Sequence, residues 1–213
     1  MKLKINSGVL LIAFTATAFF MTSCKKEMAN VQAATDSTKA IASYDPAVSF
    51  TNFKTIAVAD SVQVYKGGVV SNELTGTEDL FRQTFIDSLT ARGFTIVGLS
   101  GNPDLVLNLT HITATSTGIA DKQGFWNNYA SVYDPALYGE PGIPYAENFT
   151  TAAAVNDGIL SFELLDLKDA ASAGSVNVVW NGMVSGAQQF SSNGMANTES
   201  GVLFVKSPYL RNQ

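Results

Sequence analysis

Residues 158–184 read GILSFELLDLKDAASAGSVNVVWNGMV, and this segment decides the fold because two strand-length runs flank a turn-forming connection. In both runs apolar residues alternate with small or polar ones, as in strands with one covered face. The positions expected on the covered face are Leu160, Phe162, Leu164, Val176, Val178, Trp180 and Val184. The positions expected on the opposite face are Ser161, Glu163, Asn177 and Asn181. The segment therefore predicts a β-hairpin with one covered face and with Trp180 in the core.

A hairpin is only marginally stable by itself, so the rest of the chain has to supply further strands or a helix. Strands are expected at residues 54–60, 62–65, 94–97 and 104–112. Apolar stripes at helical spacing predict helices over residues 78–92 and 197–206. The expected fold is α+β: a mainly antiparallel β-sheet with about two helices packed on one face, in a single domain over residues 44–213.

The N-terminus has the pattern of a bacterial lipoprotein signal. Two lysines precede an apolar run over residues 9–21, which is too short to span a bilayer comfortably as a permanent helix. The run ends at MTSC, residues 21–24, which resembles the lipobox whose cysteine is lipidated and becomes the first mature residue. Cys24 is the only cysteine in the chain. We predict a signal peptide over residues 1–23, lipidation of Cys24, and a flexible tether over residues 24–43.

Composition narrows the class of protein and its partners. With 213 residues, of which 46% are hydrophobic, the chain is long enough for one domain with a real core and too apolar for general disorder. The formal net charge is -5, so there is no excess of basic residues to neutralise phosphates. We expect a membrane contact through the lipid anchor and no nucleic-acid partner.

Several short motifs follow one another in a characteristic order. They are Tyr44-Asp45-Pro46, Phe50, Phe53-Lys54-Thr55, Arg92-Gly93-Phe94, Pro103-Asp104-Leu105-Val106, Gly158-Ile159-Leu160 running to Asp166, Val179-Trp180-Asn181-Gly182, and Pro208. Their order and spacing over residues 44–209 resemble the envelope lipoprotein family called domain of unknown function 4136. The resemblance implies a lipid-anchored α+β domain in Gram-negative bacteria and no established activity. The Cys24-Lys25-Lys26 start resembles lipoproteins of the Bacteroidota.

The supply of reactive side chains restricts the chemistry. His111 is the only histidine, near the end of a strand, and alternation favours a packed or edge position for it. With one histidine and a lipidated cysteine, the usual zinc sites cannot be assembled, and we expect no metal or other cofactor. Four acids cluster around the hairpin: Asp157, Glu163, Asp166 and Asp169. A catalytic pair would have to converge, but Glu163 and Asp166 are three residues apart and should lie on opposite faces of a regular strand.

Residues 113–156 have the most open functional interpretation. This segment is rich in glycine, proline, asparagine and aromatic residues, and a loop of this length is usually functional or contains further elements. The aromatic residues considered for a ligand or partner surface are Trp126, Tyr129, Tyr133, Tyr138 and Tyr145. The alternative is that these rings form an extra core layer over the sheet. We expect Phe125 and Phe149 to help close the core and residues 133–145 to form a surface excursion.

The function expected from the sequence is that of a non-catalytic binding or envelope-maintenance protein, anchored by lipid in the cell envelope, most simply at the outer membrane. An envelope protein or a glycan is the expected partner. Two rival functions remain open at this stage. One is a carbohydrate-binding module that uses the aromatic residues of the 113–156 segment. The other is a carboxylate-dependent envelope hydrolase.

Overall fold

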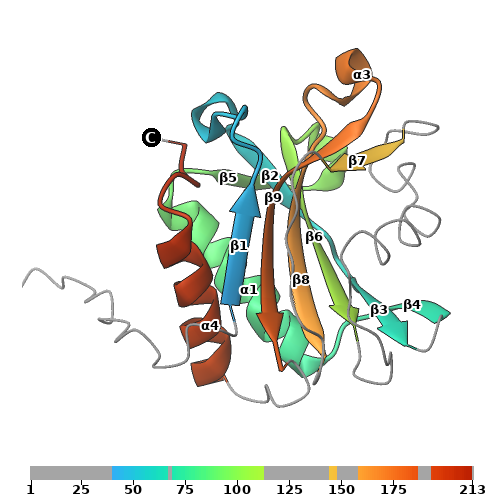
Figure 1. Ribbon diagram of the computed structural model, residues 1–213, viewed down its shortest axis with the longest axis vertical. Helices are drawn as coiled ribbons and strands as arrows, with labels where there is room; N and C mark the ends of the chain where they lie inside the picture. The colour runs from blue at the N-terminus through green and yellow to red at the C-terminus, as the bar shows by residue number, and fades with distance from the viewer. Residues whose placement is uncertain (1–39, 67–68, 113–143, 148–157, 187–192, 213) are drawn as a thin grey trace, which may run out of the picture. The chain divides into compact units, whose positions relative to one another are not determined.

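The computed structural model describes residues 40–66, 69–112, 144–147, 158–186 and 193–212, which belong to one compact unit, Val31–Gln213. They form a nine-stranded sheet with helices, shown in Figure 1. The strands are β1 (Ala40–Tyr44), β2 (Thr55–Val58), β3 (Val62–Lys66), β4 (Val69–Glu73), β5 (Thr95–Val97), β6 (Leu105–Ile112), β7 (Tyr145–Glu147), β8 (Ile159–Asp166) and β9 (Val176–Ser185). The α-helices are α1 (Gly76–Ala91), α3 (Ala170–Ala173) and α4 (Asn193–Lys206), and the 3-10 turns are η1 (Phe50–Asn52) and η2 (Leu99–Gly101). The predicted α+β class is confirmed.

Three antiparallel strands, β6, β8 and β9, form the centre of the sheet. β8 and β9 pair as the predicted hairpin. β6, the other strand predicted from strict alternation, pairs with β8 over its whole length, from Leu105 opposite Asp166 to Ile112 opposite Ile159. Short strands pair with the outer edges of this three-stranded centre. β2 and β3 pair with successive parts of β6, and β7 and β1 pair with successive parts of β9.

The sheet is mixed: its longer pairings are antiparallel, as expected, and its shorter pairings are parallel. β2 runs parallel to both β5 and β6, β3 runs parallel to β6, and β7 runs parallel to β9. The parallel pairing of β2 with β5 needs a crossover connection, and α1 lies within that connection. β2, β3, β5 and β7 have three to five residues each, and alternation along a strand shows which residues share a face, not the direction of the neighbouring strand.

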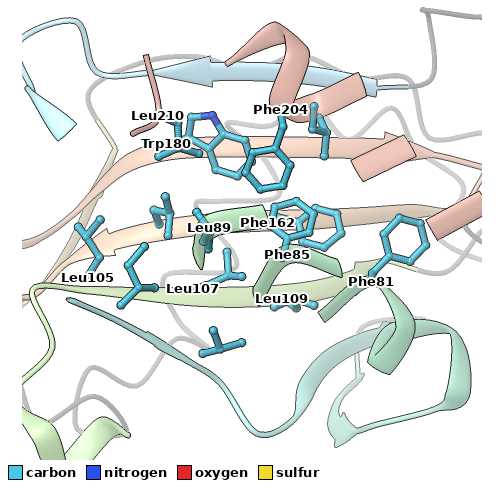
Figure 2. Packing of buried hydrophobic residues seen from close by; sticks show 14 of the residues in the cluster. Phe81, Phe85, Leu89, Leu105, Leu107, Leu109, Phe162, Trp180, Phe204 and Leu210 are labelled. Atoms are coloured by element: carbon cyan, nitrogen blue, oxygen red, sulfur yellow. The ribbon is translucent and has the colours of Figure 1, made fainter. Parts of the chain in front are cut away.

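Helices α1 and α4 pack on one face of the sheet, which we call the helix face (Figure 1). Both predicted helices are therefore confirmed, with starts at residues 76 and 193. The stripe of α1 is Phe81, Phe85 and Leu89, all fully buried. Phe85 stacks on Phe162 of β8 with ring centroids 4.1 Å apart, and it also contacts Phe204 of α4 at 5.0 Å. Figure 2 shows these rings between the helices and the sheet.

Trp180 is fully buried on the helix face, as predicted. Its indole Nε1 donates to Ser207 Oγ at 2.9 Å, so the polar edge of the ring has a partner. The ring lies over Gly182, where an added Cβ would overlap it and would also approach Leu203 at 3.2 Å. Gly182 is therefore required by the packing of Trp180.

The second hairpin arm was predicted to place Val176, Val178 and Trp180 on one face, and this is wrong for the two valines before Val179. Leu164 pairs with Trp180 but Leu165 pairs with Val178, so Val179 is an extra residue, a β-bulge. An extra residue reverses the alternation. Val178 consequently packs on the face opposite the helices, together with Val176, whereas Trp180 remains on the helix face.

The N-terminal boundary of the domain also differs from the expectation. Residues 40–43 were expected at the end of the tether, but they belong to β1, which pairs with β9 from Ala40 opposite Val184 to Tyr44 opposite Trp180. Ala40 is fully buried. The sheet therefore begins before the Tyr44-Asp45-Pro46 motif.

Candidate functional site

The face of the sheet opposite the helices, here called the second face, carries a row of buried polar side chains. Asn108, Glu163 and Asn181 are register partners on β6, β8 and β9, so they lie side by side across the three central strands. None of the three is more than 1% exposed. We call these three residues the polar row. Ser161 and Thr110, each 1% exposed, pair beside it on the same face.

Hydrogen bonds connect the polar row to Ser161. Asn181 Nδ2 donates to Ser161 Oγ at 2.9 Å and lies 3.5 Å from Glu163 Oε1. Ser161 Oγ is 3.3 Å from Glu163 Oε1, and Asn108 Nδ2 is 3.4 Å from Glu163 Oε2. Within the described part of the chain, Asn181 Oδ1 has no partner. The row therefore combines one carboxylate with amide and hydroxyl groups, and its unpaired amide oxygen is buried.

These observations correct the expectation that only one face of the sheet is covered. Polar residues that alternate with leucines are usually read as solvent-facing, but here Ser161, Glu163 and Asn181 are buried. Burial of polar groups is costly unless hydrogen bonds replace their contacts with water. The polar side chains of the second face are therefore part of the protein interior and do not face solvent.

An apolar cluster continues the second face beyond the polar row. Its buried members are Ala57, Val106, Leu165, Leu167, Ala170, Val176 and Val178. Tyr145 of β7 is half-buried and packs against this cluster, and β7 pairs with β9 at Val176. Tyr145 was expected in a surface excursion, so that expectation is wrong: the residue is part of the sheet.

The remaining aromatic residues proposed for a binding surface, Trp126, Tyr129, Tyr133 and Tyr138, lie outside the described residues. The same holds for Cys24, Phe125 and Phe149. The structure does fix where the segment attaches. Ile112 and Ile159 are register partners at one end of the sheet, whereas Tyr145 pairs with Val176 near the other end. Between β6 and β8 the chain therefore visits both ends of the sheet.

A second polar pair lies on the helix face, at the N-terminus of α1. His111 Nδ1 is 2.7 Å from Glu78 Oε1, and the Glu78 side chain is only 4% exposed. Burial acts to raise the pKa of Glu78, but the hydrogen bond and charge of His111, with the backbone N–H groups of Glu78 and Thr75, outweigh it and lower the pKa. His111 thus occupies the packed position that alternation favoured, with a carboxylate partner.

The acids around the hairpin do not converge as a catalytic pair would. Glu163 belongs to the second face, whereas Asp166, three residues later on β8, follows the helix-face alternation and accepts a hydrogen bond from the Asp169 backbone. Burial raises the pKa of Asp166 most, and the nearby Asp169 charge adds to this. Asp157 lies outside the described residues. In the described ranges no three histidine, cysteine or acidic side chains are grouped as metal ligands would be.

Two of the sequence motifs prove to join β2 to β6. Asp104 Oδ2 accepts hydrogen bonds from the backbone N–H groups of Lys54 and Thr55, at 2.6 and 3.1 Å. In return Thr55 Oγ1 accepts from the Asp104 N–H at 2.9 Å. The Asp104 carbonyl also accepts from Leu167 and Lys168 after β8. Asp104 therefore holds together the start of β2, the start of β6 and the residues that follow β8, so its role is structural.

Arg92, in a third motif, closes the C-terminal end of α4. Its guanidinium donates to the carbonyls of Phe204, Ser207 and Leu210 at 2.7, 2.7 and 2.9 Å. It also lies 4.9 Å from the centre of the Phe204 ring. A cation at this position satisfies the unpaired carbonyls of the helix end. The motifs that carry the family resemblance thus account for much of the architecture, and two of them also contain members of the polar row, Glu163 and Asn181.

The fold defines a class of single-domain α+β proteins with a mixed sheet and helices on one face. Residues 41–202 match the family model of the domain of unknown function DUF4136, and the chain belongs to this family. No helix in the described ranges has the length and apolar character needed to cross a bilayer.

Comparison with solved structures agrees with this assignment. A DUF4136 family protein from Bacteroides thetaiotaomicron has a TM-score of 0.69 and 18% identity, over 82% of this chain and 97% of that chain. The PelC dodecamer from Paraburkholderia phytofirmans has 18% identity over 82% and 98% of the two chains, with a TM-score of 0.38. A PDZ domain protein from Parabacteroides distasonis has a TM-score of 0.42 and 14% identity, over 81% and 36%. The last two likenesses are too low to support an argument. No curated protein matches the chain.

Proposed function

We propose that the protein is a lipid-anchored, non-catalytic binding module of the cell envelope, attached to the outer membrane. The observation that carries the anchor is the N-terminal pattern: two lysines, an apolar run, and MTSC ending at the sole cysteine, Cys24. Several acyl chains on one residue would hold the protein stably at a membrane, whereas one chain binds only marginally. The first described strand, β1, begins at Ala40, on the C-terminal side of this cysteine.

The arrangement of titratable groups supports binding rather than catalysis. Glu163 and Asp166 lie on opposite faces of β8, and His111 is engaged with Glu78 at 2.7 Å. Acid and base catalysis by carboxylates would require two such groups on either side of one substrate. The polar row contains a single carboxylate, Glu163, whose neighbours are amide and hydroxyl groups.

The anchor is tested by following the fate of Cys24. We expect wild-type protein to incorporate a labelled fatty acid and to sediment with membranes in the absence of detergent. Cys24→Ala should lose the label and should be released or accumulate as the longer precursor. Lys25→Ala, which changes the next residue and leaves the cysteine, is the matched control. Wild-type protein that is soluble and carries an unmodified Cys24 would contradict the proposal.

The proposed partner is an envelope protein or a glycan, bound through the aromatic segment between β6 and β8. Because Tyr145 belongs to β7, the test should spare it. Replacing residues 134–143 by a Gly/Ser linker of equal length should leave the thermal melt unchanged and abolish retention on envelope proteins or immobilised glycans. Retention on glycans alone would favour the carbohydrate-binding alternative. Unchanged retention of both kinds would remove residues 134–143, with Tyr138, from the binding surface.

A further inference from the structure

Strand β4 forms an open edge of the sheet. It pairs with β3 over five residues, from Val62 opposite Glu73 to Lys66 opposite Val69, and no other described strand pairs with it. Ser71, Asn72, Glu73 and the following Leu74 are exposed. In Figure 1 the β3–β4 hairpin projects at the end of the sheet away from α3. An open strand edge presents unpaired N–H and C=O groups that can pair with another strand.

The other short strands at the margins of the sheet are better protected than β4. β5 and β7 have only three residues each. β1 lies next to α4, and Lys206 Nζ donates to the Ala40 carbonyl at 2.8 Å. β4 has a continuous five-residue register without a bulge, and its sequence VVSNE contains neither lysine nor proline. Bulges, short length, prolines and charged side chains, lysine above all, are the usual protections of an edge. β4 has only Glu73 of these, at its end, and is the least protected edge among the described strands.

The sequence of this edge is complementary to itself under a two-fold axis at Asn72. In an antiparallel pair of two copies, Asn72 would face its own equivalent, Ser71 would face Glu73, and Leu74 would face residue 70, a valine. A hydroxyl then lies opposite a carboxylate, and an apolar residue opposite an apolar residue, with no like charges facing. Centring the pair on Ser71 would instead set both Asn72 and Glu73 opposite valines. We infer that β4 pairs with β4 of a second copy of this chain, centred on Asn72.

The hydrogen-bond pattern of the hairpin agrees with this register. Residues 66 and 69 are partners that flank a two-residue connection, and such a closing pair is hydrogen-bonded. In an antiparallel ladder, hydrogen-bonded and non-bonded pairs alternate, so the backbone groups of Val70 and Asn72 point away from β3. Together with those of Leu74 they would supply about six hydrogen bonds to a second β4.

The inference is tested by placing charged residues at position 72, which lies on the proposed two-fold axis. The full chain is kept in detergent, and light scattering measures the number of copies per particle. We expect wild-type protein to show two copies per particle. Asn72→Lys and Asn72→Glu should each give one copy, because like charges face each other. An equimolar mixture of the two variants should restore two copies. Thr95→Lys and Thr95→Glu, exposed on the β5 edge, are the matched controls and should remain paired.

Asn72→Pro gives a second test that spares the fold. Proline is tolerated at an edge position whose N–H faces away from the neighbouring strand, so this variant should keep the wild-type thermal melt and show one copy. A single-copy wild-type particle would overturn the inference, as would charge variants that stay paired. A mixture that fails to re-associate would also overturn it, because the partner residue would then not be Asn72. Capture of a foreign extended peptide by a single-copy protein would assign the edge to another partner.

Discussion

The helix face and the second face of the central strands are buried to a similar degree but are built from different chemistry. On the helix face, Phe162 of β8 stacks on Phe85 of α1. One residue along the same strand, Glu163 turns to the second face and contacts amides and a hydroxyl. Apolar burial stabilises in proportion to area and tolerates many shapes. A buried polar row contributes little net free energy but is costly when a partner is removed.

This difference suggests a division of labour. The helix face should account for most of the stability of the domain, since it collects the largest buried side chains, including Trp180, Phe81 and Phe85. The polar row should instead restrict which arrangement of the second face is acceptable, because its donors and acceptors are directional. Measurements on the two faces can separate these contributions.

The largest effect is expected for Trp180→Ala on the helix face. The substitution removes a fully buried indole and its bond to Ser207, and truncations of this kind cost about 3 to 5 kcal/mol. Denaturant unfolding of the full chain would measure the loss. Val205→Ala on α4, where the side chain is 71% exposed, is the control and should change stability little. A loss below about 1 kcal/mol for Trp180→Ala would show that this face is not the main source of stability.

A smaller loss is expected for Asn181→Leu in the polar row. The new side chain has a similar size but cannot donate to Ser161 Oγ or Glu163 Oε1, which should cost roughly 1 to 3 kcal/mol. Asn177→Leu, at a half-buried position on β9 before the bulge, is the matched control and should cost less. A double-mutant cycle with Ser161→Ala would measure the coupling. Independent effects of the two substitutions would argue against a connected row.

The pH dependence of stability should isolate the Glu78–His111 pair. The folded-state pKa of Glu78 is lowered, so its contribution is present above the ordinary glutamate pKa, about 4.3, and is lost as pH falls through the folded-state value. Glu78→Gln should therefore flatten the stability profile at acidic pH, and His111→Gln should flatten it in part. Glu73→Gln, on exposed β4, is the control. A profile unchanged in Glu78→Gln would contradict the assignment.

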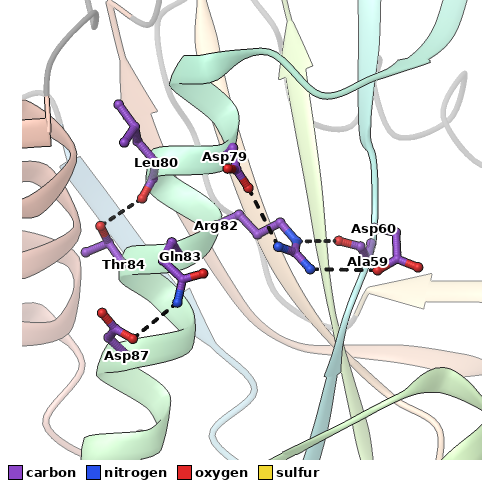
Figure 3. A network of polar contacts seen from close by, with 8 residues as sticks. All are labelled: Ala59, Asp60, Asp79, Leu80, Arg82, Gln83, Thr84 and Asp87. Atoms are coloured by element: carbon purple, nitrogen blue, oxygen red, sulfur yellow. Dashed lines mark hydrogen bonds and ion pairs between the residues drawn. The ribbon is translucent and has the colours of Figure 1, made fainter.

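The smallest effect is expected on the solvent side of α1, shown in Figure 3. Arg82 Nε donates to the Ala59 carbonyl at 2.9 Å, while its ion pairs with Asp60 and Asp79 are both 3.7 Å long. The Asp60 side chain is 96% exposed, so Asp60→Asn should change stability by less than about 0.5 kcal/mol. Arg82→Ala should cost about 1 kcal/mol because it also removes the bond to Ala59. A larger loss for Asp60→Asn than for Arg82→Ala would reverse this ranking.

Much of the helix face could be predicted from the sequence because its signals are local. Leu105, Leu107 and Leu109 alternate within one strand, and the α1 stripe repeats at helical spacing, so each pattern reveals its own buried side. The bulge at Val179 could not be predicted, since the run Val178-Val179-Trp180 is equally compatible with either alternation. The parallel pairing of β2 with β5 and β6 could not be predicted either, because alternation along a strand does not show the direction of its neighbours.

The second face could not be predicted because alternation reports only which residues share a face. Asn108 and Glu163 were correctly separated from the leucines between them, but their burial depends on packing from distant parts of the chain. The pairing of Glu78 with His111 was missed for a related reason. In the sequence, Glu78 is explained by its place at a helix start and His111 by its place near a strand end. Only the tertiary fold brings Glu78 Oε1 to 2.7 Å from His111 Nδ1.

The attachment of the long segment between Ile112 and Ile159 has a consequence for the order of folding. The β8–β9 hairpin closes a connection of roughly ten residues, whereas pairing β6 with β8 must close one several times longer, which costs roughly 1 to 2 kcal/mol more in chain entropy. Contacts that are distant in sequence tend to form late. The β2–α1–β5–β6 half and the β8–β9–α4 half should therefore assemble separately and meet along β6 and β8. Until then the leucines of β6 remain open to wrong partners, so misfolding should begin at this junction.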